Sequence, residues 1–337
     1  MNAILITDKA NLYYLTGFKG SKGFLIVTEK KSIFFTDGRY IQYAKQTLPK
    51  FIQKKLIPKK QITLKNIKVI EFDGSHITVD ELEKYKKIIK NCSFKNISEK
   101  IKDLRSEKDK NEIKLIKESQ RINEKIFLLI KKFIQESANT KKTVREIDIS
   151  QKIKDLAFEF GAETVSFDPI IAFGKNSSMP HHIPGKTKLK KGDIVLIDMG
   201  VKFKGYCSDM TRIVFTKPPT KEQKKIFEIV RKAQEAAFSQ AIAGKEAVRA
   251  DSQARKIIAK AGYGKFFRHG TGHGIGLEIH EYPSLSKKST DLLQKNSIIT
   301  IEPGIYLPGK FGIRLENMVL IGEKKSEIIT KINNDLS

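Results

Sequence analysis

The chain has 337 residues, of which 39% are hydrophobic and 30% charged, a length and composition typical of about two globular domains with buried cores. Its two cysteines, Cys92 and Cys207, lie far apart, which excludes a disulfide framework and fits a reducing cytoplasm. No basic start precedes a long apolar run at the N-terminus, and no stretch of about 18 apolar residues occurs. We therefore expect neither a signal peptide nor a membrane span.

The formal net charge of +26 raises the question of a nucleic-acid partner. Only ten of the 64 basic residues are Arg, and the Lys residues are scattered along the expected helices and turns. Sequence-specific binders depend on Arg for bidentate contacts with bases and phosphates. We therefore expect a solvated basic surface and no specific nucleic-acid partner.

Residues 1–105 have the pattern of a small α/β domain. Short runs rich in β-branched and aromatic residues predict strands, and runs with helical spacing of apolar residues predict helices. The mixed charge of residues 95–109 indicates a connector to the next domain. The expected strands lie at 23–28, 31–38 and 68–74, and the expected helices at 41–48 and 79–91.

Residues 106–337 are expected to form a second domain, in which helices are interleaved with an antiparallel sheet. A long helix is expected to begin near Ser106 or Glu107 and to present an apolar face to the core. The residues of this face are Ile113, Ile116, Ile126, Leu129, Ile130 and Phe133.

Three further helices are predicted by their start and stop signals. Capping boxes at Thr143–Glu146 and Thr220–Gln223 open two of them, which end at Gly161 and near Gly244. The last helix is expected over Val248–Gly262. Between the helices, residues 193–216 predict a hairpin with its turn at 202–205, and residues 297–307 and 312–322 predict two later strands.

Carboxylates and an imidazole recur at the ends of these expected strands. All are good ligands for hard or borderline divalent metals, and together they are too many for one four-coordinate zinc ion. Two metal ions that share bridging carboxylates would use them all, and a paired site of this kind usually performs hydrolysis. The five residues are Asp198, Asp209, His273, Glu302 and Glu316.

Each of these carboxylates also has an explanation without metal. Asp198 and Asp209, brought side by side by the hairpin, need a proton, a cation or metals, unless each forms a separate surface ion pair. Glu302, just before Pro303, is either at a solvent edge or bound. Glu316 lies in an apolar stretch, and an ion pair with Arg314, two residues earlier, is the alternative to a metal.

The remaining candidate residues are histidines. His269, His273 and His280 lie within twelve residues, in a glycine-rich segment that matches neither a dinucleotide-binding loop nor the H-E-x-x-H pattern. His181 and His182 lie in a loop between two prolines, where a histidine could donate a hydrogen bond to a developing oxyanion. Two exposed loop histidines without a catalytic role are the alternative there.

Five motifs, IDMG, SDMTR, HGTGHGIG, IEPGIY and GIRLEN, occur in an order and spacing that resemble the pita-bread metallopeptidases, which include aminopeptidase P, prolidase and methionine aminopeptidase. This resemblance covers residues from about 109 to 325. The segments YYLTGFKGSKGFLIVT and FFTDGRYIQYA are similar to the creatinase-type N-terminal domain of Xaa-Pro peptidases. The implied fold is a creatinase-like α/β domain over 1–105, followed by a catalytic domain over 106–337 with helices around a curved antiparallel sheet.

The resemblance also implies a role for each site residue. Asp198 would bind one metal and His273 and Glu302 the other, while Asp209 and Glu316 would bridge both. His181 and His280 would contact the substrate and the transition state, with His181 rather than His182 as the catalytic histidine. His269 and Tyr306 would line the proline end of the site, and Tyr306 and Arg314 would orient the aspartates.

The implied activity is that of an Xaa-Pro aminopeptidase, in which a metal-bridging hydroxide attacks the carbonyl before proline and Glu302 carries the proton to the leaving nitrogen. A prolidase that accepts only Xaa-Pro dipeptides is the alternative, and a non-catalytic pseudo-peptidase binding protein is a more remote one. Two Mn²⁺ ions are expected, with Co²⁺ or Zn²⁺ as alternatives. We further expect peptide substrates with proline at the second position, a cytoplasmic location and a homodimer.

Overall fold

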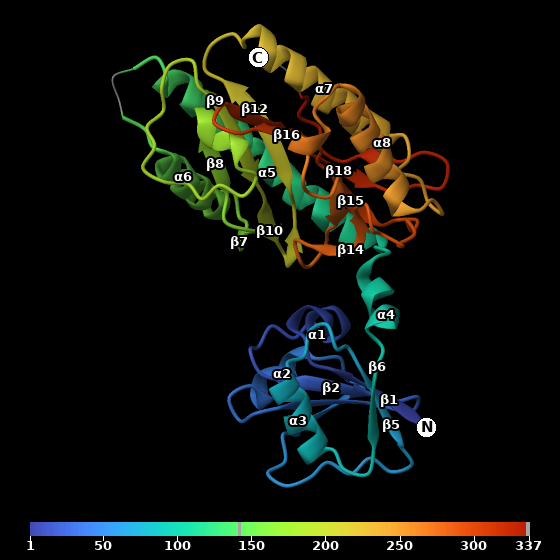
Figure 1. Cartoon of the computed structure of the whole chain (residues 1–337). Coiled ribbons are helices and arrows are strands. Elements are labelled where there is room, and N and C mark those ends of the chain that lie inside the picture. The colour runs from blue at the N-terminus through green and yellow to red at the C-terminus, as the bar shows by residue number, and fades with distance from the viewer. Residues whose placement is uncertain (141–142, 335–337) are drawn as a thin grey trace. The chain divides into compact units, whose positions relative to one another are not determined.

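The computed structural model describes residues 1–140 and 143–334, and it contains two compact units (Figure 1). The first unit covers Met1–Leu104, and the second begins at Arg105. None of the described helices is long and apolar enough to cross a membrane.

The N-terminal unit is built on one mixed six-stranded sheet, in the order β4-β3-β2-β1-β5-β6. Its core includes the stacked rings of Phe24 and Phe35, whose centroids lie 4.9 Å apart. The strands are β1 (Asn2–Ile6), β2 (Phe24–Val27), β3 (Ser32–Thr36), β4 (Ile52–Leu56), β5 (Val69–Phe72) and β6 (Ser93–Asn96), and the helices are α1 (Lys9–Thr16), α2 (Ile41–Thr47) and α3 (Val79–Ile88).

The structure confirms the three strands and two helices predicted for this unit and adds β1, β4, β6, α1 and the short helix α4 (Ser98–Ile101), which is followed by a 3₁₀ turn (Lys102–Arg105). The sequences of β4 (IQKKL) and β6 (SFKN) are largely polar because these strands lie at the two edges of the sheet. Edge strands are fixed by backbone pairing with their neighbours, so a hydrophobic pattern could not reveal them.

In the second unit, the first long helix begins at Lys110, a few residues after its expected start near Ser106 or Glu107. Asp109 caps it by accepting hydrogen bonds from the backbone of Asn111 and Glu112, and the Glu112 carboxylate accepts from the backbone of Asp109 in return. Leu129, expected on the buried face, is 43% exposed. The α-helices of this unit are α5 (Lys110–Ser137), α6 (Glu146–Glu159), α7 (Lys221–Phe238) and α8 (Ala247–Lys260).

Of the two capping boxes, only Thr220–Gln223 forms. The helix α6 is capped instead at Arg145, whose backbone N–H donates to the Asp148 carboxylate at 2.8 Å. The carboxylate of Glu146, expected to complete the first box, is fully buried and binds a loop of the site. The helix α7 ends at Phe238, earlier than the expected stop near Gly244.

The strands of the second unit form antiparallel sheets, and the predicted hairpin is present. β12 pairs with β9, which also pairs with β8, and β10 pairs with β11 around the turn at Lys204 and Gly205. The strands are β7 (Thr164–Val165), β8 (Ile170–Phe173), β9 (Ile194–Met199), β10 (Val201–Phe203), β11 (Tyr206–Cys207), β12 (Met210–Phe215), β13 (Gly272–Gly274), β14 (Glu281–Leu285), β15 (Ile298–Ile301), β16 (Gly304–Leu307), β17 (Phe311–Arg314), β18 (Asn317–Leu320) and β19 (Glu327–Ile328).

Each of the two long strands expected near the C-terminus is divided into two. The first breaks at Glu302 and Pro303, between β15 and β16, and the second breaks at Leu315 and Glu316, between β17 and β18. β15 pairs with β18, whereas β16 pairs with β17 in a separate ribbon. Both breaks therefore leave a glutamate at the point where the chain changes sheet.

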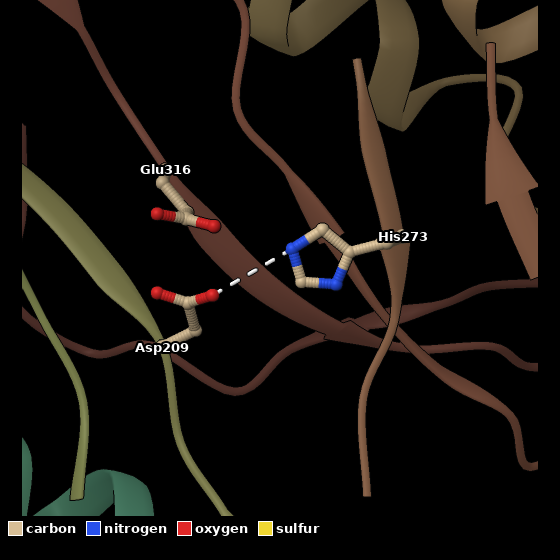
Figure 2. Close-up of side chains that lie close together, drawn as sticks. All are labelled: Asp209, His273 and Glu316. Carbon is tan, nitrogen blue, oxygen red and sulfur yellow. Dashed lines mark ion pairs between the residues drawn. The ribbon is translucent and has the colours of Figure 1, made fainter. Parts of the chain in front are cut away.

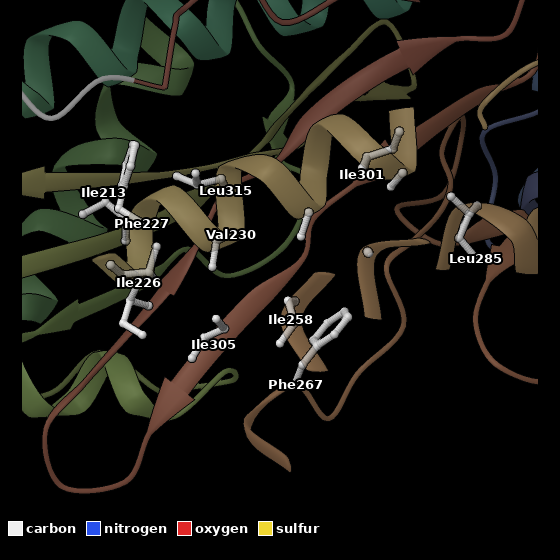
Figure 3. Close-up of a cluster of buried hydrophobic side chains, with 14 of the residues drawn as sticks. Ile213, Ile226, Phe227, Val230, Ile258, Phe267, Leu285, Ile301, Ile305 and Leu315 are labelled. Atoms are coloured by element: carbon white, nitrogen blue, oxygen red, sulfur yellow. The ribbon is translucent and has the colours of Figure 1, made fainter. Parts of the chain in front are cut away.

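The core of this unit lies on both faces of the central strands (Figure 1). In β9, Leu196 packs in the cluster with α7 and α8, whereas Val195 packs in the cluster with α5 and α6. Figure 3 shows Phe227 and Val230 of α7 in the first of these clusters. The predicted α/β class, with helices around antiparallel sheet, is confirmed.

Candidate metal centre

One cavity of about 490 Å³ in the second unit contains nearly all the residues expected to form the site. Its walls come from segments that are distant in sequence: β9, the start of β12, β13, and the two breaks near the C-terminus. The five expected metal ligands, the three expected histidine contacts and Arg314 line it, namely Asp198, Asp209, His273, Glu302, Glu316, His181, His269, His280 and Arg314.

The register of β9 and β12 places the two aspartates. Thr211 lies opposite Asp198 in this antiparallel pair, and Met210 lies opposite Met199. Asp209 precedes Thr211 by two residues, so both are directed to the side of the sheet on which Asp198 lies. The hairpin thus brings the two carboxylates to the same cavity, as the sequence predicted.

Asp209, His273 and Glu316 form the tightest group (Figure 2). One ligand atom from each lies within 4.8 Å of the others. The Nε2 atom of His273 is 3.7 Å from Oδ2 of Asp209 and 3.5 Å from Oε1 of Glu302. Atoms at these separations are too far apart to bond one another directly but close enough to share a cation.

The hydrogen bonding of the carboxylates supports the fit of cations. Oδ1 of Asp198, Oδ1 of Asp209 and Oε1 of Glu316 are buried and have no hydrogen-bond partner. A buried carboxylate oxygen without a partner is costly, and cations bound in this cavity would compensate such oxygens. This donor set, rich in oxygen with one imidazole, suits divalent metals.

Burial and mutual repulsion both raise the pKa values of the carboxylates in this group. Burial and the charge of Glu316 raise the pKa of Asp209 well above its ordinary value. Burial and the charge of Glu302 do the same to the pKa of Glu316, and burial raises the pKa of Glu302 to about 7. Such a cluster remains ionised at neutral pH when positive charge is bound among its members.

His273 is prepared to act as a ligand through Nε2. Its Nδ1 lies 3.0 Å from the carbonyl oxygen of Gly274, which fixes the proton on Nδ1. Burial lowers the pKa of His273 to about 4, so the ring is neutral at physiological pH. A side chain at Gly272 would lie 1.9 Å from the carbonyl oxygen of Thr300, so only glycine allows β13 to approach β15 here.

Arg314 orients one aspartate. Its Nη2 donates to Oδ2 of Asp198 at 2.6 Å, and its Nε donates to the hydroxyl of Thr211 at 3.0 Å. The Thr211 hydroxyl in turn donates to Oε2 of Glu316 at 2.7 Å. Arg314 therefore binds Asp198 directly, and its Nε also lies 4.0 Å from Oε2 of Glu302. Among the described residues Arg314 reaches Glu316 only through Thr211, so the direct Arg314–Glu316 ion pair considered above is not present.

Tyr306 lies behind the cavity wall and does not line the cavity, contrary to our expectation of a substrate contact. Its hydroxyl accepts from Nη1 of Arg314 at 2.8 Å and lies 2.8 Å from Nε2 of His269. The position beside Arg314 agrees with the expected orienting role. Burial lowers the pKa of His269 to about 3, so this ring is neutral. Its Nδ1 lies 2.7 Å from the Gly270 carbonyl oxygen and carries the proton, so its Nε2 accepts a hydrogen bond from the Tyr306 hydroxyl.

The two loop histidines differ in their contacts. His181 lines the cavity, and the preceding carbonyl oxygen, that of Pro180, accepts from Nη1 of Arg314 at 3.2 Å. His182 points away and binds the buried carboxylate of Glu146 at 2.9 Å. Glu146 also accepts from the backbone N–H groups of Phe173 and Gly185. Only one of the pair therefore faces the site, as its position after proline implied.

Three positioning residues were missed by the sequence analysis: Glu146, Thr211 and Lys108. The buried Lys108 ammonium binds Glu281 at 3.1 Å, next to His280, whose ring lies edge-on to His273 at 4.4 Å. For Thr211, the hairpin register opposite Asp198 was an available signal. No local pattern marks Glu146 or Lys108, because each partner is distant in sequence.

Comparison with known proteins identifies the family of each unit. Residues 114–323 match metallopeptidase family M24, and residues 1–106 match the creatinase/prolidase N-terminal domain. An Xaa-Pro dipeptidase of Pyrococcus horikoshii is 34% identical over 338 residues, which cover 100% of this chain and 94% of that protein.

Two solved structures resemble the whole chain. The X-Pro aminopeptidase from Thermotoga maritima has a TM-score of 0.86 and 33% identity, covering 99% of this chain and 97% of that one. The prolidase from Pyrococcus furiosus has a TM-score of 0.88 and 32% identity, covering 98% and 97%. The chain therefore belongs to the Xaa-Pro peptidases of metallopeptidase family M24, with a creatinase/prolidase N-terminal domain and the pita-bread fold.

Proposed function

We propose that the protein is a dinuclear-metal Xaa-Pro aminopeptidase, which removes the first residue of peptides that carry proline second. The observation that carries the proposal is the convergence of five metal-ligand side chains on one cavity, with three carboxylate oxygens that lack any partner. Asp198, Asp209, His273, Glu302 and Glu316 would hold two divalent cations, for which Mn²⁺ is the preferred candidate and Co²⁺ or Zn²⁺ are alternatives. Such cations supply a nucleophile from water at neutral pH.

The residues around the ligands perform the remaining steps. His181 and His280, which line the same cavity, would donate hydrogen bonds to the oxygen of the scissile carbonyl as negative charge develops there. Glu302, which lines the same cavity, would carry a proton to the proline nitrogen. That proton is required because the proline nitrogen is a poor leaving group unless it is protonated and departs as a neutral amine.

A patch of apolar side chains in the cavity supports the preference for proline. Phe167, Ile170 and Ile279 line it together with His269. A prolyl bond has no N–H and a restricted φ, so recognition depends on the shape and packing of the ring. The patch gives the pyrrolidine ring an apolar surface and buries it away from water.

The proposal predicts the substrate range. With Mn²⁺ present, Ala-Pro-Ala should be hydrolysed about as fast as Ala-Pro. Ala-Ala-Ala should be hydrolysed at least about tenfold more slowly, because its second residue has no pyrrolidine ring to pack against the apolar patch. Competition assays with product analysis by mass spectrometry measure all three rates. Intact tripeptides beside hydrolysed dipeptides would identify a prolidase, the alternative supported by the similarity to the prolidase from Pyrococcus furiosus. Equal rates for Ala-Ala-Ala and Ala-Pro-Ala would remove both assignments.

The two loop histidines give a second prediction. His181→Ala should lower kcat by about 10²–10³, the loss typical of one oxyanion donor, with normal metal content. His182→Ala should cost far less, because His182 acts only by holding the loop to Glu146. His76→Ala, which removes a histidine paired with Asp73 in the N-terminal unit, is the matched control and should leave kcat unchanged. Equal losses in His181→Ala and His182→Ala would contradict the role given to His181.

A further inference from the structure

A second hollow, of about 510 Å³, adjoins the metal cavity. The two share His269, Gly270 and Ser286 as lining residues, so one opens beside the other. The character of the second hollow is different, because its other side chains are mainly basic. They include Arg255, Lys265, Arg268, Lys287 and Lys288.

One of these cations is structural. Arg255 binds the buried Asp251 carboxylate through two nitrogens, at 2.6 and 3.0 Å. It also donates to the backbone carbonyl oxygens of Phe267, at 3.1 Å, and of His269. Arg255 thus holds the segment that forms the wall between the hollow and the metal cavity, and its charge is compensated.

The other four cations are exposed and have no carboxylate within 4.0 Å in the part of the chain that the structure describes. Lys287 and Lys288 occupy the centre of a turn closed by the hydrogen bond from Ser289 N–H to the Ser286 carbonyl at 3.1 Å. Lys265 and Arg268 lie on the opposite segment, where Nε of Arg268 donates to the Lys265 carbonyl at 3.3 Å. Their charges therefore act together on whatever occupies the hollow.

The second hollow lies where the residue after proline would be placed in a bound peptide. If the proline packs beside His269, the residues after it run past Gly270 and Ser286 toward the four cations. A peptide bound in the opposite chain direction would bring its protonated amino terminus to the same four cations, which would repel it. The patch consequently favours one direction of binding and a negative charge directly after proline.

We propose that this hollow is a subsite for an acidic residue, so that the enzyme prefers peptides of the form Xaa-Pro-Asp or Xaa-Pro-Glu. The inference rests on the proposed function, because it takes proline to occupy the metal cavity. The cations are exposed, so their effect acts through water and is screened by salt within about 10 Å at 0.1 M. The preference therefore depends strongly on ionic strength.

The test compares three tripeptides that are amidated at the C-terminus, so that they differ in charge only at the third side chain: Ala-Pro-Asp-NH₂, Ala-Pro-Ala-NH₂ and Ala-Pro-Lys-NH₂. With the Mn²⁺-loaded protein at low salt, kcat/KM should be at least about tenfold higher for the Asp peptide than for the Lys peptide. The ratio should fall to about two- or threefold in 0.5 M NaCl. If the amides are not cleaved, their inhibition constants against Ala-Pro hydrolysis should show the same order.

The double variant Lys287→Glu/Lys288→Glu should abolish or reverse the preference while Ala-Pro-Ala-NH₂ is still bound. Lys324→Glu/Lys325→Glu, which changes two exposed lysines outside the hollow by the same charge, is the matched control and should keep the preference. A ratio near one in the unmodified protein at low salt, or the same loss in both double variants, would overturn the subsite. Failure to bind any of the proline peptides would instead refute the proposed function.

Discussion

Asp209→Asn should remove peptide hydrolysis to below detection while the protein remains folded. Asp209 lies among His273, Glu302 and Glu316, and its charge is needed to hold cations in this group. Burial and repulsion from Glu316 already raise the pKa of Asp209, so the neutral amide relieves repulsion in the metal-free protein. The melting temperature without metal should therefore be unchanged or higher. Activity, bound metal and melting temperature are measured on the same preparation.

Glu316→Gln should behave in the same way, since Glu316 carries a second unpartnered oxygen into the cavity. Asp193→Asn is the matched control: this carboxylate is half-buried and accepts from the Lys190 backbone outside the cavity, so hydrolysis should be retained. Retained turnover together with a large loss of stability in Asp209→Asn would show that these carboxylates serve the fold and not the reaction.

Removal of metal should abolish activity completely and reversibly. We expect no hydrolysis of Ala-Pro-Ala after dialysis against a chelator, and restoration by Mn²⁺ or Co²⁺ at least as well as by Zn²⁺, because the ligand set is one imidazole among four carboxylates. Bound divalent ions should also raise the melting temperature, since they neutralise buried repelling charges. Mg²⁺, which prefers an octahedral oxygen shell that retains water, serves as the comparison ion. Full hydrolysis in excess chelator would contradict the metal requirement.

Several of the candidate metal ligands could be named from the sequence because they lie next to strong local signals. Asp198 and Asp209 flank a hairpin turn with positive φ at Lys204 and Gly205, which fixes the register of the two strands. Glu302 follows an apolar strand and precedes a proline. The five motifs then supplied the family and the expected role of each residue, which strand patterns alone do not supply.

The positions of Arg314 and Tyr306 beside the aspartates were expected, but other contacts around these candidate ligands could not be predicted in the same way. The Glu146 carboxylate resembled part of a capping box, yet it binds a loop 36 residues later. Tyr306 was expected at the substrate, yet its hydroxyl is held behind the wall by Arg314. Both outcomes depend on which buried polar group finds a partner across the fold, and tertiary packing decides this.

Errors in the element boundaries have a similar origin. The first long helix begins at Lys110 because Asp109 caps it, although it was expected to begin near Ser106 or Glu107. The two late strands break at Glu302 and Glu316 because the chain passes there from one sheet to another. The pattern of apolar and polar residues predicts which side chains are buried, but it does not predict which strands pair with each other.

The most direct test of the account is a titration of Mn²⁺ into the chelated protein, with bound metal counted by native mass spectrometry and Ala-Pro-Ala hydrolysis measured at each step. The five ligands and their unpartnered oxygens predict two ions per chain, with full activity reached only when the second ion binds. In Asp209→Asn, the doubly loaded species should be absent. Full activity with one ion per chain, or with none, would contradict the dinuclear site.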